Sequence, residues 1–216
     1  MLRLTNTEAR LSGLGGLTHL THLALAGLSY ERAGLAVALP ALAPQLLSLH
    51  LQVSGSDITT DCKTAQHVSG WDTADLRNIG RLCARLQELR LTECAVGRSS
   101  SQAVPGMTRL YPALTSLTVC SAVSPSQLLV LAGHASRLAS LRTGPNCWLS
   151  ARLLSRLIAL NPLAELKRLQ VDRPADLALP ALFALLTTAT RLETVVGVEH
   201  WDGLDTQSVS SYVYWN

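Results

Sequence analysis

The chain has 216 residues, 48% of them apolar, so it can bury a continuous core and is too apolar to stay disordered. The formal net charge is only +3 and no long basic run occurs, so neither a nucleic acid nor a membrane is favoured as partner. No apolar run approaches the roughly 18 residues of a membrane span, and the first residues lack the charged-then-apolar order of a signal peptide.

The cysteines are odd in number, widely spaced and mostly set in apolar sequence, which is typical of free thiols and not of a disulfide framework. They are Cys62, Cys83, Cys94, Cys120 and Cys147. We therefore expect an intracellular protein, in the cytoplasm.

An apolar motif with the spacing apolar, two residues, apolar, one residue, apolar occurs four times and continues, less perfectly, in three further copies. Its copies are Leu20, Leu23, Leu25; Leu46, Leu49, Leu51; Leu86, Leu89, Leu91; Leu114, Leu117, Val119; Leu138, Leu141, Thr143; Leu166, Leu169, Val171; and Leu192, Val195, Gly197. Successive first positions are 26, 40, 28, 24, 28 and 26 residues apart. The motif therefore repeats along the chain, and the interval of 40 residues contains one insertion. Leu2 and Leu4 resemble the last two positions of an earlier copy.

Each copy predicts a short strand, because its last two apolar positions lie two residues apart and therefore share one face. The following stretch often has helical spacing and a start signal. Such signals are Asp72 before residues 73–86, Ser124 with Pro125 before 126–138, and Ser150 before 151–160. One strand and one helix cannot bury their own apolar sides, so successive units must stack. The sequence thus predicts an α/β fold with a curved parallel sheet and an outer layer of helices.

The segment LQELRLTEC, from Leu86 to Cys94, and the looser LTSLTVCSA, from Leu114 to Ala122, carry the motif LxxLxLxx(N/C)xL. On these segments the chain resembles the leucine-rich-repeat family, in its ribonuclease-inhibitor-like or cysteine-containing subclass. The resemblance implies a solenoid, or horseshoe, with strands on the concave face and helices on the convex face.

We expect one repeat domain over residues 1–200, interrupted by a polar inserted loop at 54–72. The loop is either a tolerated surface excursion or part of a binding site. Residues 201–216 leave the pattern and contain Trp201, Tyr212, Tyr214 and Trp215. This segment is interpreted either as an aromatic cap or as an irregular tail.

No motif for catalysis, metal or cofactor is found. The glycines of residues 13–16 lack the ending of a phosphate loop and are interpreted as a turn. Cys62 and His67, with His50 nearby, have no accompanying ligand pair, and no nucleophile motif orders the Ser, His and Asp residues. We therefore expect neither an enzyme nor a metal or cofactor site.

The residues that alternate with the buried strand positions form a mildly polar face. From it we select, as candidate partner-binding residues, His50, Gln52, Glu88, Arg90, Arg142, Arg168, Gln170 and Asp172. Arginine is notable here, since its planar guanidinium can bind a carboxylate or phosphate with two hydrogen bonds. An exposed sheet face must, however, carry polar residues of some kind.

The expected function is a protein-protein interaction module that binds a protein partner through this face. Two alternatives stay open. One alternative is the substrate-recognition part of an F-box-type ubiquitin ligase, which the resemblance alone suggests. The other is a structural subunit of a large assembly.

Overall fold

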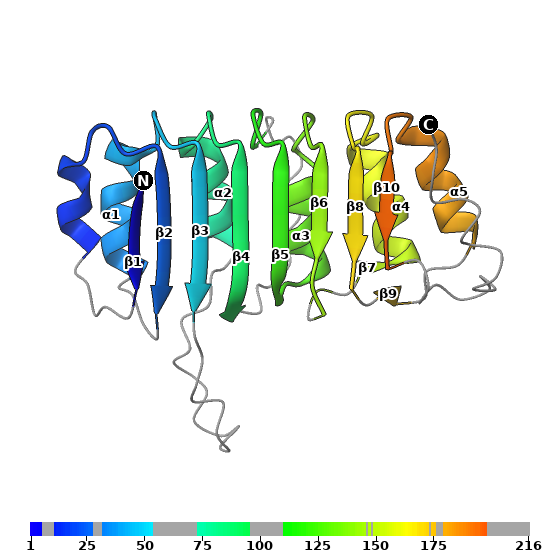
Figure 1. Ribbon diagram of the computed structural model, residues 1–216, viewed down its shortest axis with the longest axis horizontal. Coiled ribbons are helices and arrows are strands. Elements are labelled where there is room, and N and C mark those ends of the chain that lie inside the picture. The colour runs from blue at the N-terminus through cyan, green and yellow to red at the C-terminus, as the bar shows by residue number, and fades with distance from the viewer. Residues whose placement is uncertain are drawn as a thin grey trace, which may run out of the picture.

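The computed structural model describes residues 1–5, 11–27, 32–53, 73–95, 110–145, 147, 149–172, 174–175 and 179–197. The described residues form a mixed α/β fold built on one open sheet of eight parallel strands (Figure 1). The strands are β1 (Leu2–Thr5), β2 (His22–Gly27), β3 (Ser48–Val53), β4 (Glu88–Ala95), β5 (Ser116–Ala122), β6 (Ser140–Thr143), β8 (Arg168–Val171) and β10 (Thr194–Val196). They lie side by side in chain order, so the expected parallel α/β class is confirmed.

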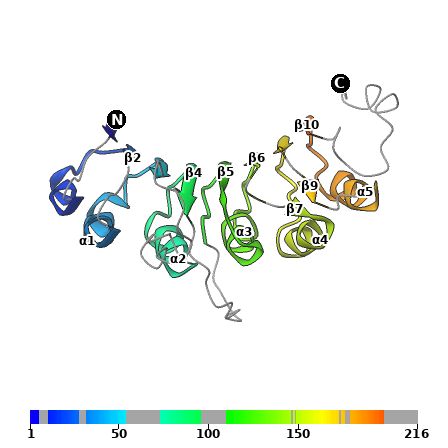
Figure 2. The ribbon, with the colours of Figure 1, turned by 90° about the horizontal axis from the view of Figure 1, so that it is seen from below.

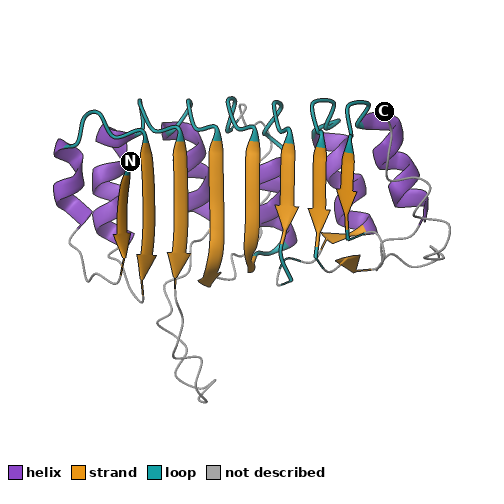
Figure 3. Ribbon diagram, in the orientation of Figure 1, coloured by secondary structure: helices purple, strands orange, loops and turns teal. Residues whose placement is uncertain are grey.

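The helices form a second layer on one face of this sheet (Figure 3). They are a 3₁₀-helix at Leu11–Gly16 and the α-helices α1 (Arg32–Leu42), α2 (Thr73–Leu82), α3 (Pro125–Ala132), α4 (Ala151–Leu160) and α5 (Leu179–Thr188). Neighbouring α-helices pack against each other along the row. Viewed from below, the row of strands bows and the helices lie on its outer side (Figure 2).

One backbone arrangement recurs at the start of successive strands. The carbonyl of the residue before a strand accepts two N–H groups from the next unit, as the Leu47 carbonyl does from Gln87 (2.8 Å) and Glu88 (3.0 Å). Equivalent carbonyls belong to Thr21, Leu47, Gln87, Thr115, Ala139 and Lys167. Six copies of one hydrogen-bond pattern show that the sequence period is also a structural period.

The repeated leucines form the core between the two layers. Parallel pairing in register aligns the second motif positions across the sheet, and Leu23, Leu49, Leu89, Leu117, Leu141 and Leu169 are all buried. The predicted strand positions are confirmed. The last copy is less well covered, because Leu192 and Val195 are only partly buried. Leu2 and Leu4 lie on β1, which pairs with β2, so the earlier partial copy is also confirmed.

The start signals of two helices act as the sequence predicts. Ser124 forms a capping box with Gln127, and Pro125 occupies the first turn of α3. The Ser150 hydroxyl accepts the Leu153 N–H at 3.2 Å at the start of α4. Asp72 lies outside the described residues, as do the segments 54–72 and 201–216, and α2 begins at Thr73. The domain boundaries stay a prediction.

Several local features were not predicted. The glycines interpreted as a turn belong to the 3₁₀-helix at Leu11–Gly16, and a second sheet pairs β7 (Leu149–Ser150) with β9 (Pro174–Ala175). Gly197 occupies the last motif position with φ +89°, where a Cβ atom would lie 1.8 Å from the Val171 carbonyl oxygen. Only glycine fits there, since both the dihedral angle and the space exclude a side chain.

Among the described residues, Tyr111 is the largest fully buried side chain, and its hydroxyl donates to the Leu76 carbonyl. Its ring lies against Gly80 of α2, where an added Cβ atom would approach a ring carbon to 2.7 Å. A glycine inside a helix lowers helix stability, but here it makes room for the tyrosine.

Candidate functional site

The open face is the side of the eight-stranded sheet opposite the helices (Figure 2). Side chains alternate between the two sides of a strand, so Leu89 and Leu91 are buried while Arg90 between them is exposed. The register aligns the open-face residues in three rows. Row 1 is His22, Ser48, Glu88, Ser116, Ser140, Arg168 and Thr194; row 2 is Arg3, Ala24, His50, Arg90, Thr118, Arg142, Gln170 and Val196; row 3 is Ala26, Gln52, Thr92 and Cys120.

The eight candidate binding residues all belong to this face or its border, but they do not form one cluster. Row 1 holds Glu88 and Arg168, row 2 holds His50, Arg90, Arg142 and Gln170, row 3 holds Gln52, and Asp172 directly follows β8. Arg3 was missed. Its place between Leu2 and Leu4 in an alternating strand was the signal that could have found it.

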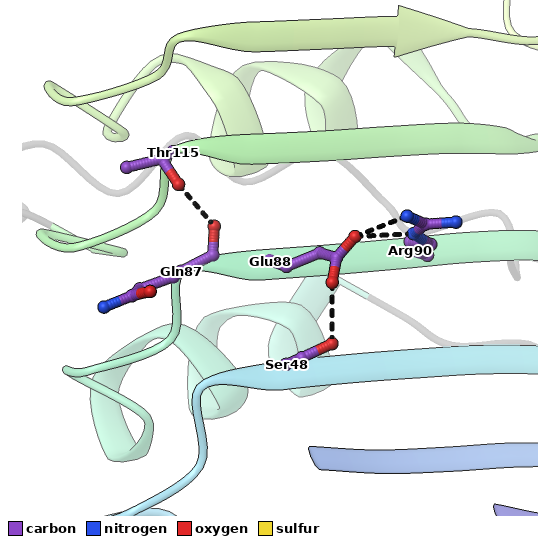
Figure 4. Close-up of polar contacts among 5 residues, drawn as sticks. All are labelled: Ser48, Gln87, Glu88, Arg90 and Thr115. Carbon is purple, nitrogen blue, oxygen red and sulfur yellow. Dashed lines mark hydrogen bonds and ion pairs between the residues drawn. The ribbon is translucent and has the colours of Figure 1, made fainter. Parts of the chain in front are cut away.

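Glu88 is the centre of a hydrogen-bonded group on β3 and β4 (Figure 4). One carboxylate oxygen, Oε1, accepts from Arg90 Nε at 2.7 Å and lies 2.6 Å from its Nη2, while Oε2 accepts from Ser48 Oγ at 2.9 Å. Burial alone would raise the pKa of Glu88, but the hydrogen bonds from Arg90 and Ser48 outweigh it and lower that pKa. The guanidinium of Arg90 is therefore already engaged by a carboxylate of its own strand.

Figure 4 also shows how this group is attached to the repeat. Thr115 Oγ1 donates to the Gln87 carbonyl at 3.1 Å, beside the two backbone bonds that the same carbonyl accepts. Glu88 is the next residue along the chain. Its backbone position is thus fixed by bonds between neighbouring units.

His50 lies in row 2, and its Nε2 is 2.9 Å from Thr92 Oγ1, within hydrogen-bond distance. Burial lowers the pKa of His50, and the positive charges of Arg90 and Arg3 lower it further against the opposing effect of Glu88. The imidazole is therefore held in its neutral form at neutral pH. The N-terminal half of the open face thus satisfies most of its own polar groups.

The C-terminal half of the face differs. Gln170 Nε2 donates to Asp172 Oδ1 at 3.0 Å. Arg142 and Arg168 are exposed, and no carboxylate in the described part of the chain forms an ion pair with either. With respect to the described residues, the five N–H groups of each guanidinium are available for a carboxylate or another anion.

Cys120 is the cysteine on this part of the open face. Burial raises the pKa of the Cys120 thiol, and the nearby Asp172 carboxylate acts in the same direction against the effect of Arg142. Since the thiolate is the reactive form, a raised pKa disfavours nucleophilic chemistry here.

Metal binding and membrane insertion depend on other features of the same described residues. No group of three or more His, Cys, Asp or Glu residues there is arranged to hold a metal ion. Among the helices that the structure describes, none has the length and apolarity to cross a bilayer.

Comparison with protein-family models found no match, and comparison with curated protein sequences found none either.

Proposed function

We propose that this chain is a leucine-rich-repeat solenoid of the horseshoe type that binds a protein partner through its open face and is not an enzyme. The repeat motif supports the family, and the recurring carbonyl that accepts two N–H groups supports the solenoid. The bowed row of strands, with helices outside, makes the open face the concave one (Figure 2).

The observation that carries the binding role is the asymmetry of the sheet. One side is covered by helices, while the other presents rows of polar side chains that no described helix or strand covers. Eight strands span seven inter-strand steps of about 4.8 Å, or about 34 Å in total. A surface of that length suits a macromolecule better than a small ligand, which prefers a concave, mostly apolar pocket.

We place the protein inside the cell, in the cytoplasm. The described cysteines Cys83, Cys120 and Cys147 are not in disulfides. Burial raises the pKa of the Cys83 thiol to about 12, so it acts as a small apolar core group. Free thiols are typical of a reducing compartment.

The test compares two tryptophan substitutions with the wild-type chain in affinity capture from a cell lysate. Ser116→Trp places a bulky group in the middle of the open face, and Ser155→Trp places the same group on the exposed side of α4. We expect partners retained by the wild type and by Ser155→Trp to be lost with Ser116→Trp. Equal retention by all three folded proteins, checked by circular dichroism, would show that the open face is not the binding surface.

A further inference from the structure

We propose that Arg142 and Arg168 form the acidic-segment site of the open face, where two carboxylates of a partner protein's extended chain are bound. This deepens the proposed function and rests on it. The open face spans eight strands. The proposal assigns the binding of an acidic partner to one place on it, at β6 and β8.

Arg142 and Arg168 differ from Arg90 in their partners. Arg90 lies on the open face like Arg142 and Arg168, but it is held by Glu88 through its Nε and Nη2 atoms. An acidic partner would have to displace that carboxylate to use Arg90. Arg142 and Arg168 have no such competitor among the described residues, so a partner carboxylate gains a charge-assisted bond without breaking one.

The C-terminal part of the chain carries an excess of positive charge. Residues 110–197 contain eight Lys and Arg residues against four Asp and Glu residues. Two of these carboxylates are engaged elsewhere, Glu165 with Arg191 at 2.5 Å and Glu193 with Lys167 at 3.4 Å.

Asp172 is the acidic residue nearest to Arg142 and Arg168 in the register. It follows β8 and accepts a hydrogen bond from Gln170. The two charges of Arg142 and Arg168 therefore leave a net positive charge over β6 and β8, which the single Asp172 carboxylate offsets only in part. Charge complementarity favours a negative partner at this place.

The spacing of Arg142 and Arg168 suits an extended chain. Arg142 pairs with Gln170, so Arg168 lies on the adjacent strand and two residues back along it. A lateral step of about 4.8 Å and two residues of about 3.3 Å each place the two Cα atoms about 8 Å apart.

Alternate residues of an extended peptide lie about 6.6 Å apart on one side, within reach of two long flexible side chains. Two separated cations match two single carboxylates better than one compact phosphate, which is best held by donors that converge on it. Neutral hydrogen-bonding groups surround the pair, namely Ser116, Thr118, Ser140 and Gln170.

The test measures fluorescence anisotropy of a labelled peptide of alternating Glu and Ser, titrated with the full chain at low ionic strength. The variant Arg142→Gln/Arg168→Gln removes the site. Its matched control, Arg152→Gln/Arg156→Gln, makes the same change of net charge on the exposed side of α4, away from the open face.

We expect the site variant to bind the Glu peptide about ten-fold more weakly, because losing two charge-assisted contacts removes on the order of 1.4 kcal/mol. The control variant should bind like the wild type, and a peptide of alternating Gln and Ser should bind no variant. Equal weakening in both double variants, or equal binding of the Gln peptide, would overturn the proposal. Tighter binding of a phosphoserine peptide or an oligonucleotide, lost in the site variant alone, would overturn the carboxylate assignment.

This result is separable from the test of the proposed function. If Ser116→Trp abolishes partner capture while the Glu peptide does not bind, the open face still binds a protein but the acidic-segment site is wrong. If capture is unaffected by Ser116→Trp, the proposed function fails whatever the peptide does.

Discussion

The two sides of the same strands differ in what each residue contributes. On β5, Leu117 and Val119 are fully buried against the helices, while Ser116 and Thr118, which alternate with them, are half-buried on the open face. Apolar burial stabilises the fold by about 1.5–3 kcal/mol for a large aliphatic side chain, whereas exposed polar contacts contribute about 1 kcal/mol or less. One side therefore sets stability, and the other is available for recognition.

The largest expected effect comes from a pair of adjacent substitutions on β5. Leu117→Ala should lower the free energy of unfolding by about 2–5 kcal/mol, because it opens a cavity between Leu89 and Leu141. Thr118→Ala, one residue further, should lower it by about 1 kcal/mol or less. Urea unfolding followed by circular dichroism measures both.

Similar losses in the two variants would contradict the division of roles between the two sides. A small loss in Leu117→Ala alone would mean that the layer of helices does not pack tightly on β5. Each repeat unit contacts mainly its neighbours. Weakening the unit that contains β5 should therefore also lower the cooperativity of unfolding along the array.

A smaller loss is expected from a polar residue on the buried side. Asn161 Nδ2 donates to the carbonyls of Ala132 and Ala135, both at 2.9 Å, and its Oδ1 accepts the Leu163 N–H at 3.1 Å. Asn161→Ala leaves these three backbone groups without that partner, at a cost of about 2–3 kcal/mol.

The matched control is Asn78→Ala, at an exposed position of α2, which should change stability by less than about 0.5 kcal/mol. If both alanine variants unfold at the same urea concentration, the bonds from Asn161 do not hold the ends of α3 and α4 together.

The strands were predictable from the sequence because their apolar period is regular and each copy needs the next for burial. The helix starts at Ser124 and Ser150 were predictable because a cap is a local property of a few residues. Asn161 was not, since its bonds reach carbonyls 26 and 29 residues earlier in the chain. Nor did local sequence indicate that Gly80 makes room for Tyr111.

For the candidate site, the sequence predicted only which residues lie on the open face, and not which of them interact with one another. Alternation places Arg90, Arg142 and Arg168 on one face, but it does not say which arginine has an ion-pair partner. That depends on Glu88 lying two residues before Arg90 and on the rotamers that join them. The difference between an engaged and an available arginine therefore appears only with side-chain coordinates.

Releasing Arg90 from Glu88 should make the N-terminal half of the open face resemble the C-terminal half, because both would then present arginine side chains that an acidic peptide can bind. Glu88→Gln removes the charge that holds Arg90, so affinity for the Glu peptide should rise about three-fold while stability falls by about 1 kcal/mol or less. The control is Ser48→Ala, which removes a hydrogen bond to the same carboxylate but leaves the ion pair in place. An unchanged affinity in Glu88→Gln would show that Glu88 does not block Arg90.

The smallest effect concerns the pH dependence of stability through His50. Its pKa in the folded protein lies below the ordinary value, through burial and the charges of Arg90 and Arg3, while Glu88 acts in the opposite direction. In the unfolded chain the imidazole takes up a proton near pH 6.5, so acidification favours the unfolded state. The contribution of His50 is therefore complete above about pH 6.5 and is lost as the pH falls through the folded-state pKa.

Urea unfolding of the wild type and of His50→Gln between about pH 7.5 and about pH 5.5 isolates this contribution. His134 has a pKa lowered by burial and by Arg77, but it is present in both proteins and cancels in the comparison. Stability should fall more steeply with acid in the wild type than in His50→Gln. If the free energy of unfolding changes equally with pH in both proteins, the environment of His50 does not lower its pKa. The positive charges of Arg3 and Arg90 would then act on His50 less than their positions in row 2 imply.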